Sequence, residues 1–247
     1  MAAPPASRTL LWDYMGRVPY AAAVELQLAA RQALRRGEGP ERLLLLEHPP
    51  VYTLGRNASR ADVMASPQWL AAHGVEVVEC DRGGQVTYHG PGQLVGYPIV
   101  NLSPDRRDVR RYVADLQEVM VRTLADYAIH AEARQGQELV GVWVGESKIA
   151  SIGVHLSHWL TTHGFALNVS TDLALFAGIV PCGLRQIEMT SIARLAGAAP
   201  ALPAIASVLA RHFGQVFDRH LVWAPAAAAS VAPEAASSPA AQVASPG

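Results

Sequence analysis

Short apolar segments with the character of β-strands alternate with longer segments of helical periodicity along the first 223 of the 247 residues. The strongest pattern lies at residues 108–130, where apolar residues recur at steps of three and four along one helix face. These residues are Val109, Tyr112, Val113, Leu116, Met120, Leu124 and Tyr127. A helix with one apolar stripe must bury that stripe against another layer, and the strands supply it. The alternation therefore predicts an α+β fold of mixed β-sheets flanked by α-helices.

The other elements are indicated by caps, breakers and short apolar runs. Strands are predicted at 8–14, 42–47 and 75–80, and a three-stranded meander at 139–144, 148–156 and 165–169. Helices are predicted at 19–36, 67–74 and 203–217, the last of them packing on the outside. Gly37 is expected to end the first helix, and Ser66 with Pro67 to begin the second.

Residues 224–247 differ in composition from the rest of the chain. They include 11 Ala, 4 Pro and 4 Ser. The prolines interrupt any helix that the alanines favour, and without large apolar groups the segment cannot offset the entropy lost on ordering. We therefore expect a catalytic domain at 8–223 and a disordered tail at 224–247.

The charge balance and the termini exclude several function classes. Twenty basic and 21 acidic residues leave a net charge of −1, which provides no long-range field for nucleic-acid binding. No stretch reaches the ~18–20 apolar residues of a membrane helix. The chain does not begin like a secretory signal, and two cysteines are too few for a disulfide framework. A cytoplasmic protein without nucleic-acid or membrane partners is expected.

Lys148 is the one lysine among the 20 basic residues. The 42 alanines and 19 arginines indicate a bias toward Ala and Arg codons. Such a bias would replace lysine by arginine at every position that needs only a positive charge. A lysine that must give up or share a proton would be retained, because arginine stays protonated in proteins. Two interpretations of Lys148 stay open here, a chemical role and an accident of composition.

A glycine-rich segment at residues 82–93, RGGQVTYHGPGQ, follows a predicted strand directly. Glycines let the backbone approach a ligand closely, so this segment can wrap a substrate. It matches neither the phosphate-binding P-loop nor the GxGxxG dinucleotide fingerprint. The alternative is a turn without a ligand, in which His89 is a structural histidine.

Two further segments carry reactive side chains. GVWVGESKIASIG at 141–153 places Lys148 among small residues that leave room for a ligand. GIVPCGLRQIEMTSI at 178–192 places Cys182 between a proline and a glycine. A cysteine is often a small buried hydrophobe, but near an ammonium group its lowered pKa makes it a nucleophile. Cys80, in a predicted strand, is expected to be inert.

The motifs together resemble the octanoyltransferases of lipoate synthesis, which are relatives of the biotin and lipoate protein ligases. The resemblance extends from about residue 10 to residue 217. Its five motifs, in order, are EHPPVYTLGR, RGGQVTYHGPGQLVGYPI, GVWVGESKIASIG, HGFALNV and GIVPCG.

The resemblance implies roles for individual residues. The catalytic pair is Cys182, which would carry the acyl group as a thioester, and Lys148, which would lower the pKa of the cysteine. The implied substrate-binding residues are Arg82, Gly83, Gly84, Gln85, Val86, Thr87, Tyr88, His89, Ser151, Ile152, Gly153, Gly164, Phe165 and Ala166. Neither a metal nor a cofactor is expected.

The implied reaction moves an octanoyl group from octanoyl-acyl carrier protein to a lysine amine of a lipoyl domain. The acceptors would be the lipoyl domains of 2-oxoacid dehydrogenases and the glycine cleavage H protein. A thioester is already activated, which would explain the missing ATP-binding loop. Backbone N–H groups near Cys182 or in the glycine-rich segment could stabilise the oxyanion. The base that deprotonates the amine is left open between Lys148 and His89.

Two weaker expectations concern the substrates. An apolar slot for the acyl chain could be lined by Tyr88, Val95, Ile152, Phe165 and Leu167, all equally explained as core residues. An acidic carrier protein could dock on the cluster Arg106, Arg107, Arg110 and Arg111, which otherwise forms a solvated face.

Three other functions compete with the acyltransferase. An ATP-dependent lipoate–protein ligase needs no cysteine nucleophile, so Cys182 argues against it. A thioesterase would use Cys182 with His89 or His163 to pass the acyl group to water. A non-catalytic lipoyl-domain binding module would bind its partner without forming an adduct.

Overall fold

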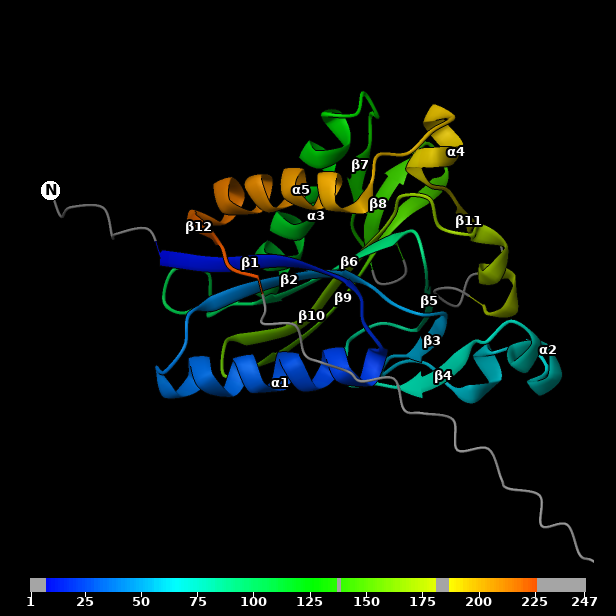
Figure 1. The fold of residues 1–247 in the computed structure, drawn as a ribbon, viewed down its shortest axis with the longest axis horizontal. Helices are drawn as coiled ribbons and strands as arrows, with labels where there is room; N and C mark the ends of the chain where they lie inside the picture. Colours follow the sequence, from blue (N-terminus) through cyan, green and yellow to red (C-terminus); the bar gives the residue numbers. More distant parts are fainter. Residues whose placement is uncertain (1–7, 137–138, 181–186, 226–247) are drawn as a thin grey trace, which may run out of the picture.

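Two β-sheets form the frame of the protein in a computed structural model that describes residues 8–136, 139–180 and 187–225 (Figure 1). The larger sheet contains β1 (Arg8–Arg17), β2 (Glu41–Glu47), β6 (Gln93–Ile99), β7 (Glu132–Arg134), β8 (Gly141–Val144), β9 (Ser147–Ser157), β10 (Leu160–Asn168), β11 (Glu188–Met189) and β12 (Arg219–Trp223). The smaller sheet contains β3 (Val51–Leu54), β4 (Glu76–Glu79) and β5 (Val86–His89).

The strand order mixes parallel and antiparallel neighbours. The larger sheet runs β12-β1-β2-β6-β10-β9-β8-β7, and β11 pairs with β9 beside it. The pairs β1–β12, β1–β2 and β9–β11 are parallel, whereas β8, β9 and β10 form the antiparallel meander that the sequence predicts. The smaller sheet has the order β4-β3-β5.

Helices cover both faces of the larger sheet, so the predicted α+β architecture is confirmed. The helices are α1 (Tyr20–Arg36), α2 (Pro67–Ala72), α3 (Val109–Ala125), α4 (Ile192–Ala196) and α5 (Leu202–Phe217), with 3₁₀ turns η1 (Arg60–Asp62) and η2 (Leu173–Gly178). In Figure 1, α1 lies along one face of the sheet and α3 with α5 along the other. Among the described residues, no helix combines the length and the apolar character needed to cross a membrane.

Capping residues explain where the helices begin and end, and two of them, Gly37 and Ser66, are predicted from the sequence. Gly37 ends α1 with a left-handed φ of 72°, and the Ser66 hydroxyl accepts the Trp69 N–H at the start of α2. Asp108 caps α3 by accepting two backbone N–H groups. The prediction of a helix to residue 130 is wrong at its end, because Ala128 has a φ of 57° and the chain turns into β7.

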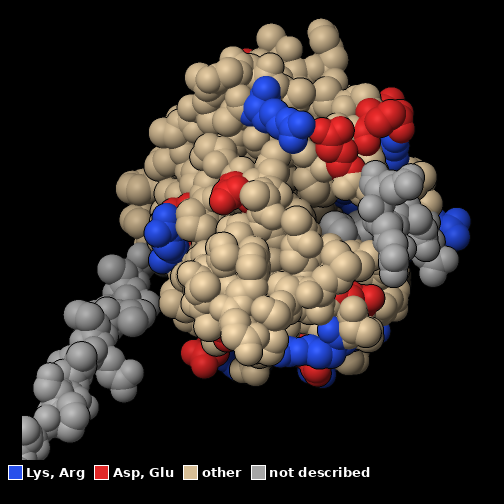
Figure 2. All heavy atoms as spheres, turned by 90° about the vertical axis from the view of Figure 1, so that its right-hand side faces the viewer, with Lys and Arg blue, Asp and Glu red and all other residues tan. Residues whose placement is uncertain are grey.

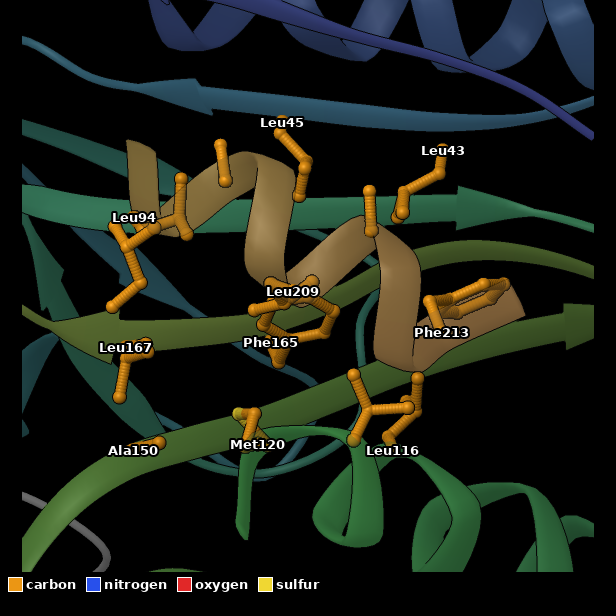
Figure 3. Close-up of a cluster of buried hydrophobic side chains, with 14 of the residues drawn as sticks. Leu43, Leu45, Leu94, Leu116, Met120, Ala150, Phe165, Leu167, Leu209 and Phe213 are labelled. Atoms are coloured by element: carbon orange, nitrogen blue, oxygen red, sulfur yellow. The ribbon is translucent and has the colours of Figure 1, made fainter. Parts of the chain in front are cut away.

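The main hydrophobic core fills the space between the larger sheet, α3 and α5 (Figure 3). Sheet side chains such as Leu43, Leu94 and Leu167 meet Leu116 of α3 and Phe213 of α5 there. Half of the 16 residues of α5 are buried, so this helix packs on the outside of the sheet, as predicted, and gives one of its faces to the core. The core therefore occupies one side of the sheet and leaves the other side for α1 and the smaller sheet.

Three buried strands differ from the sequence expectation. β3 lies in a region with no predicted element, and β5 and β6 lie within or directly after the glycine-rich segment 82–93. That segment is therefore part strand and part turn, not one continuous loop. Every residue of β6 is buried, which removes the alternation of polar and apolar residues by which a half-exposed strand is recognised.

Candidate active site

A cavity of about 120 Å³ lies where β9 and β10 of the larger sheet face α1, β5 and the segment that leads into β5. Residues from all of these elements meet in it. They are Tyr20, Asn57, Arg82, Gly84, Gln85, Val86, Thr87, His89, Tyr97, Val140, Lys148, Ser151, Ile152, Gly153, His163, Gly164, Phe165 and Ala166. The structure thus brings together three chain segments that the sequence analysis selected separately.

Two of the predicted substrate-binding residues do not line this cavity. Gly83 is tied to β9 by its N–H, which donates to the carbonyl of Val154 at 2.9 Å. Tyr88 is fully buried in a separate core cluster with Tyr52 and Phe176. The remaining predicted substrate-binding residues all belong to the lining.

The apolar slot expected from the sequence is only partly formed by the residues named for it. Ile152 and Phe165 line the cavity, but Val95 and Leu167 are core residues, as is Tyr88. Phe165 also packs in the main core, where its ring fills the space above Gly96 that a Cβ would occupy.

Lys148 is 2 % exposed, on β9 at the wall of the cavity. Its Nζ lies 5.5 Å from the centre of the Trp143 ring, a cation–π distance. A Cβ at Gly141 would collide with Cε of Lys148 and stand 3.2 Å from Nζ, so the glycine makes room for the lysine. The sequence pointed to Lys148 but not to the roles of Gly141 and Trp143.

Cys182 lies outside the described residues, in the gap 181–186, but the chain on each side of the gap is anchored. Val180 donates its N–H to the carbonyl of Asp62 at 2.9 Å. After the gap, β11 pairs with β9 so that Met189 stands opposite Lys148. Strand pairing therefore places Met189, seven residues after Cys182, beside the lysine.

Cys80, expected to be inert, is half-buried just after β4. Its thiol donates a hydrogen bond to the carbonyl of Leu54 at 3.2 Å. This cysteine does not belong to the cavity lining.

His89, at the end of β5, is buried and has a hydrogen bond on one ring nitrogen. Its Nδ1 lies 2.7 Å from Oε1 of Gln93, the first residue of β6. Burial above all, and then the neighbouring His48 and Arg82, hold the pKa of His89 well below its usual range. The ring is therefore neutral at physiological pH.

Arg82 forms part of the cavity wall and is held by the smaller sheet. Its guanidinium donates to the backbone carbonyl of Thr53 at 2.6 Å and to the Thr53 hydroxyl at 2.8 Å. The preceding residue, Asp81, contacts two histidines of the larger sheet, His163 Nε2 at 2.7 Å and His155 Nδ1 at 2.8 Å. The segment that carries Arg82 is thus clamped between the two sheets.

Sequence reasoning missed several members of the cavity. Tyr20 lies outside every motif. Asn57, Tyr97 and Val140 lie inside a motif or directly beside one, but nothing in the local pattern separates them from core or turn residues. Among the described residues, no group of three or more His, Cys, Asp and Glu side chains is arranged to hold a metal ion.

The arginine cluster proposed as a docking surface is divided by the structure. Arg106 is buried: it pairs with Asp115 and lies 4.9 Å over the Phe217 ring, so it serves the fold. The docking hypothesis for Arg106 is therefore wrong, whereas Arg107 and the two arginines in the first turn of α3 are exposed. On the face shown in Figure 2, acidic and basic side chains lie interspersed among uncharged ones.

Known proteins resemble this chain over most of its length. The chain matches the lipoyl protein ligase A/B catalytic domain over residues 19–214. An octanoyltransferase of Solibacter usitatus is 50% identical over 204 residues, which cover 83% of this chain and 91% of that protein. An octanoyltransferase of Chloroflexus aurantiacus is 51% identical over 215 residues, which cover 85% of this chain and 95% of that protein.

Solved structures share the fold at much lower identity. A bipartite lipoate protein ligase of Thermoplasma acidophilum has a TM-score of 0.68 at 18% identity, over 89% of this chain and 87% of that one. The biotin protein ligase of Aquifex aeolicus has a TM-score of 0.51 at 10% identity, over 85% and 70%. Family match, close relatives and fold agree: the chain belongs to the octanoyltransferases, transferase enzymes built on the lipoyl protein ligase A/B catalytic domain.

Proposed function

We propose that the protein transfers an octanoyl group from octanoyl-acyl carrier protein to a lysine amine of a lipoyl domain, through a thioester on Cys182. The observation that carries this proposal is the buried Lys148 at the cavity wall, with Met189 of the chain that follows Cys182 paired opposite it. The octanoyltransferase relatives at about half identity support the acyl group.

The first half of the reaction loads the enzyme. The ammonium of Lys148 favours the thiolate of Cys182, because a nearby positive charge lowers the pKa of a thiol. The thiolate attacks the thioester carbonyl of the donor, the new C–S bond forms, and the thiolate of the carrier protein leaves. One thioester replaces another, so the step needs no ATP.

The second half transfers the acyl group to the acceptor. The neutral lysine amine attacks the carbonyl of the Cys182 thioester, an N–C bond forms, and the C–S bond breaks. The amine loses one proton to a base in the cavity, and the cysteine returns as a thiolate. Backbone N–H groups beside the reacting carbonyl would stabilise the negative oxygen.

The acceptors are the lipoyl domains of 2-oxoacid dehydrogenases and the glycine cleavage H protein, and the reaction is the first step of endogenous protein lipoylation. The Thermoplasma acidophilum ligase of the same fold was solved in a study of that ligase and its E2 lipoyl domain, which supports a lipoyl domain as the acceptor.

Intact-mass spectrometry tests the proposal. Protein mixed with octanoyl-acyl carrier protein should gain one octanoyl group, and the Cys182→Ala variant should gain none. A Cys80→Ser variant is the matched control and should load as the unchanged protein does. Adding a lipoyl domain should move the label to that domain without ATP.

The other outcomes identify the competing functions. Acylation of the lipoyl domain that requires ATP would indicate a ligase. Release of free octanoic acid in place of transfer would indicate a thioesterase. A complex with the lipoyl domain and no adduct in any mixture would indicate a binding module.

A further inference from the structure

A chain of hydrogen bonds connects His89 in the cavity to the strand beside Lys148. Nδ1 of His89 lies 2.7 Å from Oε1 of Gln93. Nε2 of Gln93 donates to Oδ1 of Asn168 at 2.9 Å, and Nδ2 of Asn168 donates to the carbonyl of Thr190 at 3.0 Å. Gln93 and Asn168 are each 1 % exposed, so these bonds are shielded from bulk water.

The donor and acceptor of every hydrogen bond in this network are determined by two backbone carbonyls, which can only accept. The Thr190 carbonyl requires the NH₂ of Asn168, so the Asn168 oxygen faces Gln93 and requires an NH₂ there. The carbonyl of Tyr88 requires the same NH₂ of Gln93, at 3.1 Å. The oxygen of Gln93 therefore faces His89, and Nδ1 of His89 must carry the proton.

This arrangement determines the chemical state of the other ring nitrogen. His89 is neutral, so a proton on Nδ1 leaves Nε2 with a lone pair. Among the described residues no hydrogen bond to Nε2 is formed, and the ring lines the cavity. Nε2 can accept a proton or an N–H there.

The end of this hydrogen-bond network that is remote from His89 lies next to Lys148. The N–H of Thr190 donates to the carbonyl of Lys148 at 2.9 Å. His163 also lines the cavity, but it bonds Asp81 through Nε2 and stands opposite Val154 of β9. Val154 is six residues along the strand from Lys148, about 20 Å at the usual rise per residue.

We propose that His89 Nε2 takes the proton from the acceptor amine during acyl transfer, and that Gln93 is a positioning residue that keeps His89 in the required tautomer. The proposal rests on the proposed function, because it assigns the base for the second half of that reaction. It separates the two tasks: Lys148 keeps its proton and holds the thiolate, while His89 serves the amine.

The proton balance of this step is closed. The amine enters as the neutral form after its ammonium loses one proton to solvent. As the N–C bond forms, Nε2 of His89 takes the second proton, and the thiolate of Cys182 leaves. The His89 imidazolium then releases its proton to solvent, which the low pKa of this buried histidine favours.

Single-turnover kinetics of the full-length protein test the assignment. Loading from octanoyl-acyl carrier protein is measured by intact mass, and the loaded enzyme is then mixed with a lipoyl domain. His89→Gln should slow transfer by about 100-fold more than it slows loading. Gln93→Leu should slow transfer by about tenfold more than loading, because the correct tautomer is no longer enforced.

A double variant separates positioning from a merely structural effect. If Gln93 acts through His89, the variant with both changes should transfer no more slowly than His89→Gln alone. Gln117→Leu is the matched control, since Gln117 is also fully buried and donates to two backbone carbonyls. It should slow loading and transfer to the same extent.

Three results would overturn the inference. In the first, Gln93→Leu slows loading and transfer equally. In the second, the double variant transfers more slowly than His89→Gln, by the product of the two single effects. In the third, His163→Gln slows transfer and His89→Gln does not. Failure of the unchanged protein to load at all would instead refute the proposed function.

Nitrogen-15 NMR of labelled histidine gives a readout that does not depend on activity. The His89 resonances, identified by their loss in His89→Gln, should show a pyridine-type Nε2 and a pyrrole-type Nδ1. Gln93→Leu should shift both toward the average of the two tautomers. A pyrrole-type Nε2 in the unchanged protein would contradict the proposal.

Discussion

At the scale of single residues, the cavity depends on buried groups whose charge is set by their surroundings. The Lys148 side chain passes the space left by Gly141 and reaches the face of Trp143. A buried ammonium needs compensation for its lost hydration, and an aromatic face or a thiolate provides part of it. In the reaction proposed above, the lysine and the cysteine stabilise each other's charged forms.

Removing the charge of Lys148 should raise the pKa of the Cys182 thiol. In a Cys80→Ser background, we expect Lys148→Met to move the pH midpoint of Cys182 alkylation upward by about one unit or more. Iodoacetamide labelling followed by mass spectrometry measures this midpoint. Arg134→Met is the matched control, because Arg134 lies over the same Trp143 ring and should leave the midpoint in place. An unmoved midpoint in Lys148→Met would rule out the pairing.

His48 makes the stability of the protein sensitive to acid. It is fully buried, with Nδ1 bonded to the carbonyl of Val18 and Nε2 to the hydroxyl of Tyr97. Burial lowers the pKa of His48 from 6.5 to about 4. The folded protein therefore protonates this histidine at a lower pH than the unfolded chain does. As the pH is lowered from 6.5 to about 4, protonation of this group in the unfolded chain should decrease the unfolding free energy by about 1.4 kcal/mol per pH unit.

Urea unfolding at several pH values checks this slope. His48→Gln keeps one donor and one acceptor but does not titrate, so its stability should depend less on pH between 6.5 and 4. The burial of His89 and His163 lowers their pKa values too, and both contribute in the same direction. If the unchanged protein and His48→Gln had parallel pH profiles, His48 would not be the titrating group.

At the scale of elements, the segment between β4 and β5 joins the two sheets at the cavity. Burial opposes ionisation of Asp81, but the hydrogen bond and charge of His163, with the charge of His155, outweigh it and lower the pKa of this carboxyl. The clamp therefore persists to more acidic pH than an ordinary aspartate would allow. Gly153 of β9 lets the segment pack closely, since a Cβ there would stand 2.9 Å from the Gly83 carbonyl.

Releasing this clamp should weaken substrate binding more than it slows chemistry. We expect Asp81→Ala to raise the KM for octanoyl-acyl carrier protein several-fold, about 1 kcal/mol of binding, with a smaller change in kcat. His155→Ala removes one of the two contacts and should have a smaller effect. Steady-state kinetics of both variants decide it. A fall in kcat at constant KM would instead place Asp81 in the chemical step.

Helices were easier to predict than strands for a physical reason. α1, α2 and α3 carry their own start or stop signals in Gly37, Ser66 and Asp108. β6 has no such signal, because it is buried on both faces and contains Gly96 and Pro98, which usually mark turns. Its place between β2 and β10 depends on partners distant in sequence.

The candidate site shows the same division. Segments 82–89, 151–153 and 164–166 could be recognised because each is a contiguous motif. Tyr20 and Tyr97 could not, since their presence in the cavity follows from the packing of α1 and β6 against the meander. The orientation of His89 depends on an amide network that no local pattern encodes.

At the scale of the whole molecule, the last strand completes the sheet that begins with the first. β12 pairs in parallel with β1, from Arg8 opposite Arg219 to Trp12 opposite Trp223. The Arg219 guanidinium lies 2.5 Å from the Glu41 carboxylate, and both side chains are less than 5 % exposed. Loss of Arg219 would leave a buried carboxylate with less compensation, which is costly.

Truncation should therefore have opposite results on the two sides of β12. A chain ending at residue 225 should keep the melting temperature and the transfer rate of the full chain, because it retains β12 and its pairing with β1. A chain ending at residue 218 should lose about 3 kcal/mol or more, through the broken ion pair and the exposed edge of β1. Calorimetry of both proteins measures this difference. Equal melting temperatures would show that β12 is dispensable.

The larger sheet also divides the molecule into two compartments with different evolutionary freedom. Its α3–α5 side holds the main core, whereas most of the cavity lies on the side of α1 and the smaller sheet. A substitution at Ser151, Thr87 or Ala166 would change the shape of the cavity without opening a void in the main core. Selection for a different acyl chain or acceptor can therefore act on one compartment while the other keeps the protein folded, which favours divergence of substrates within a constant fold.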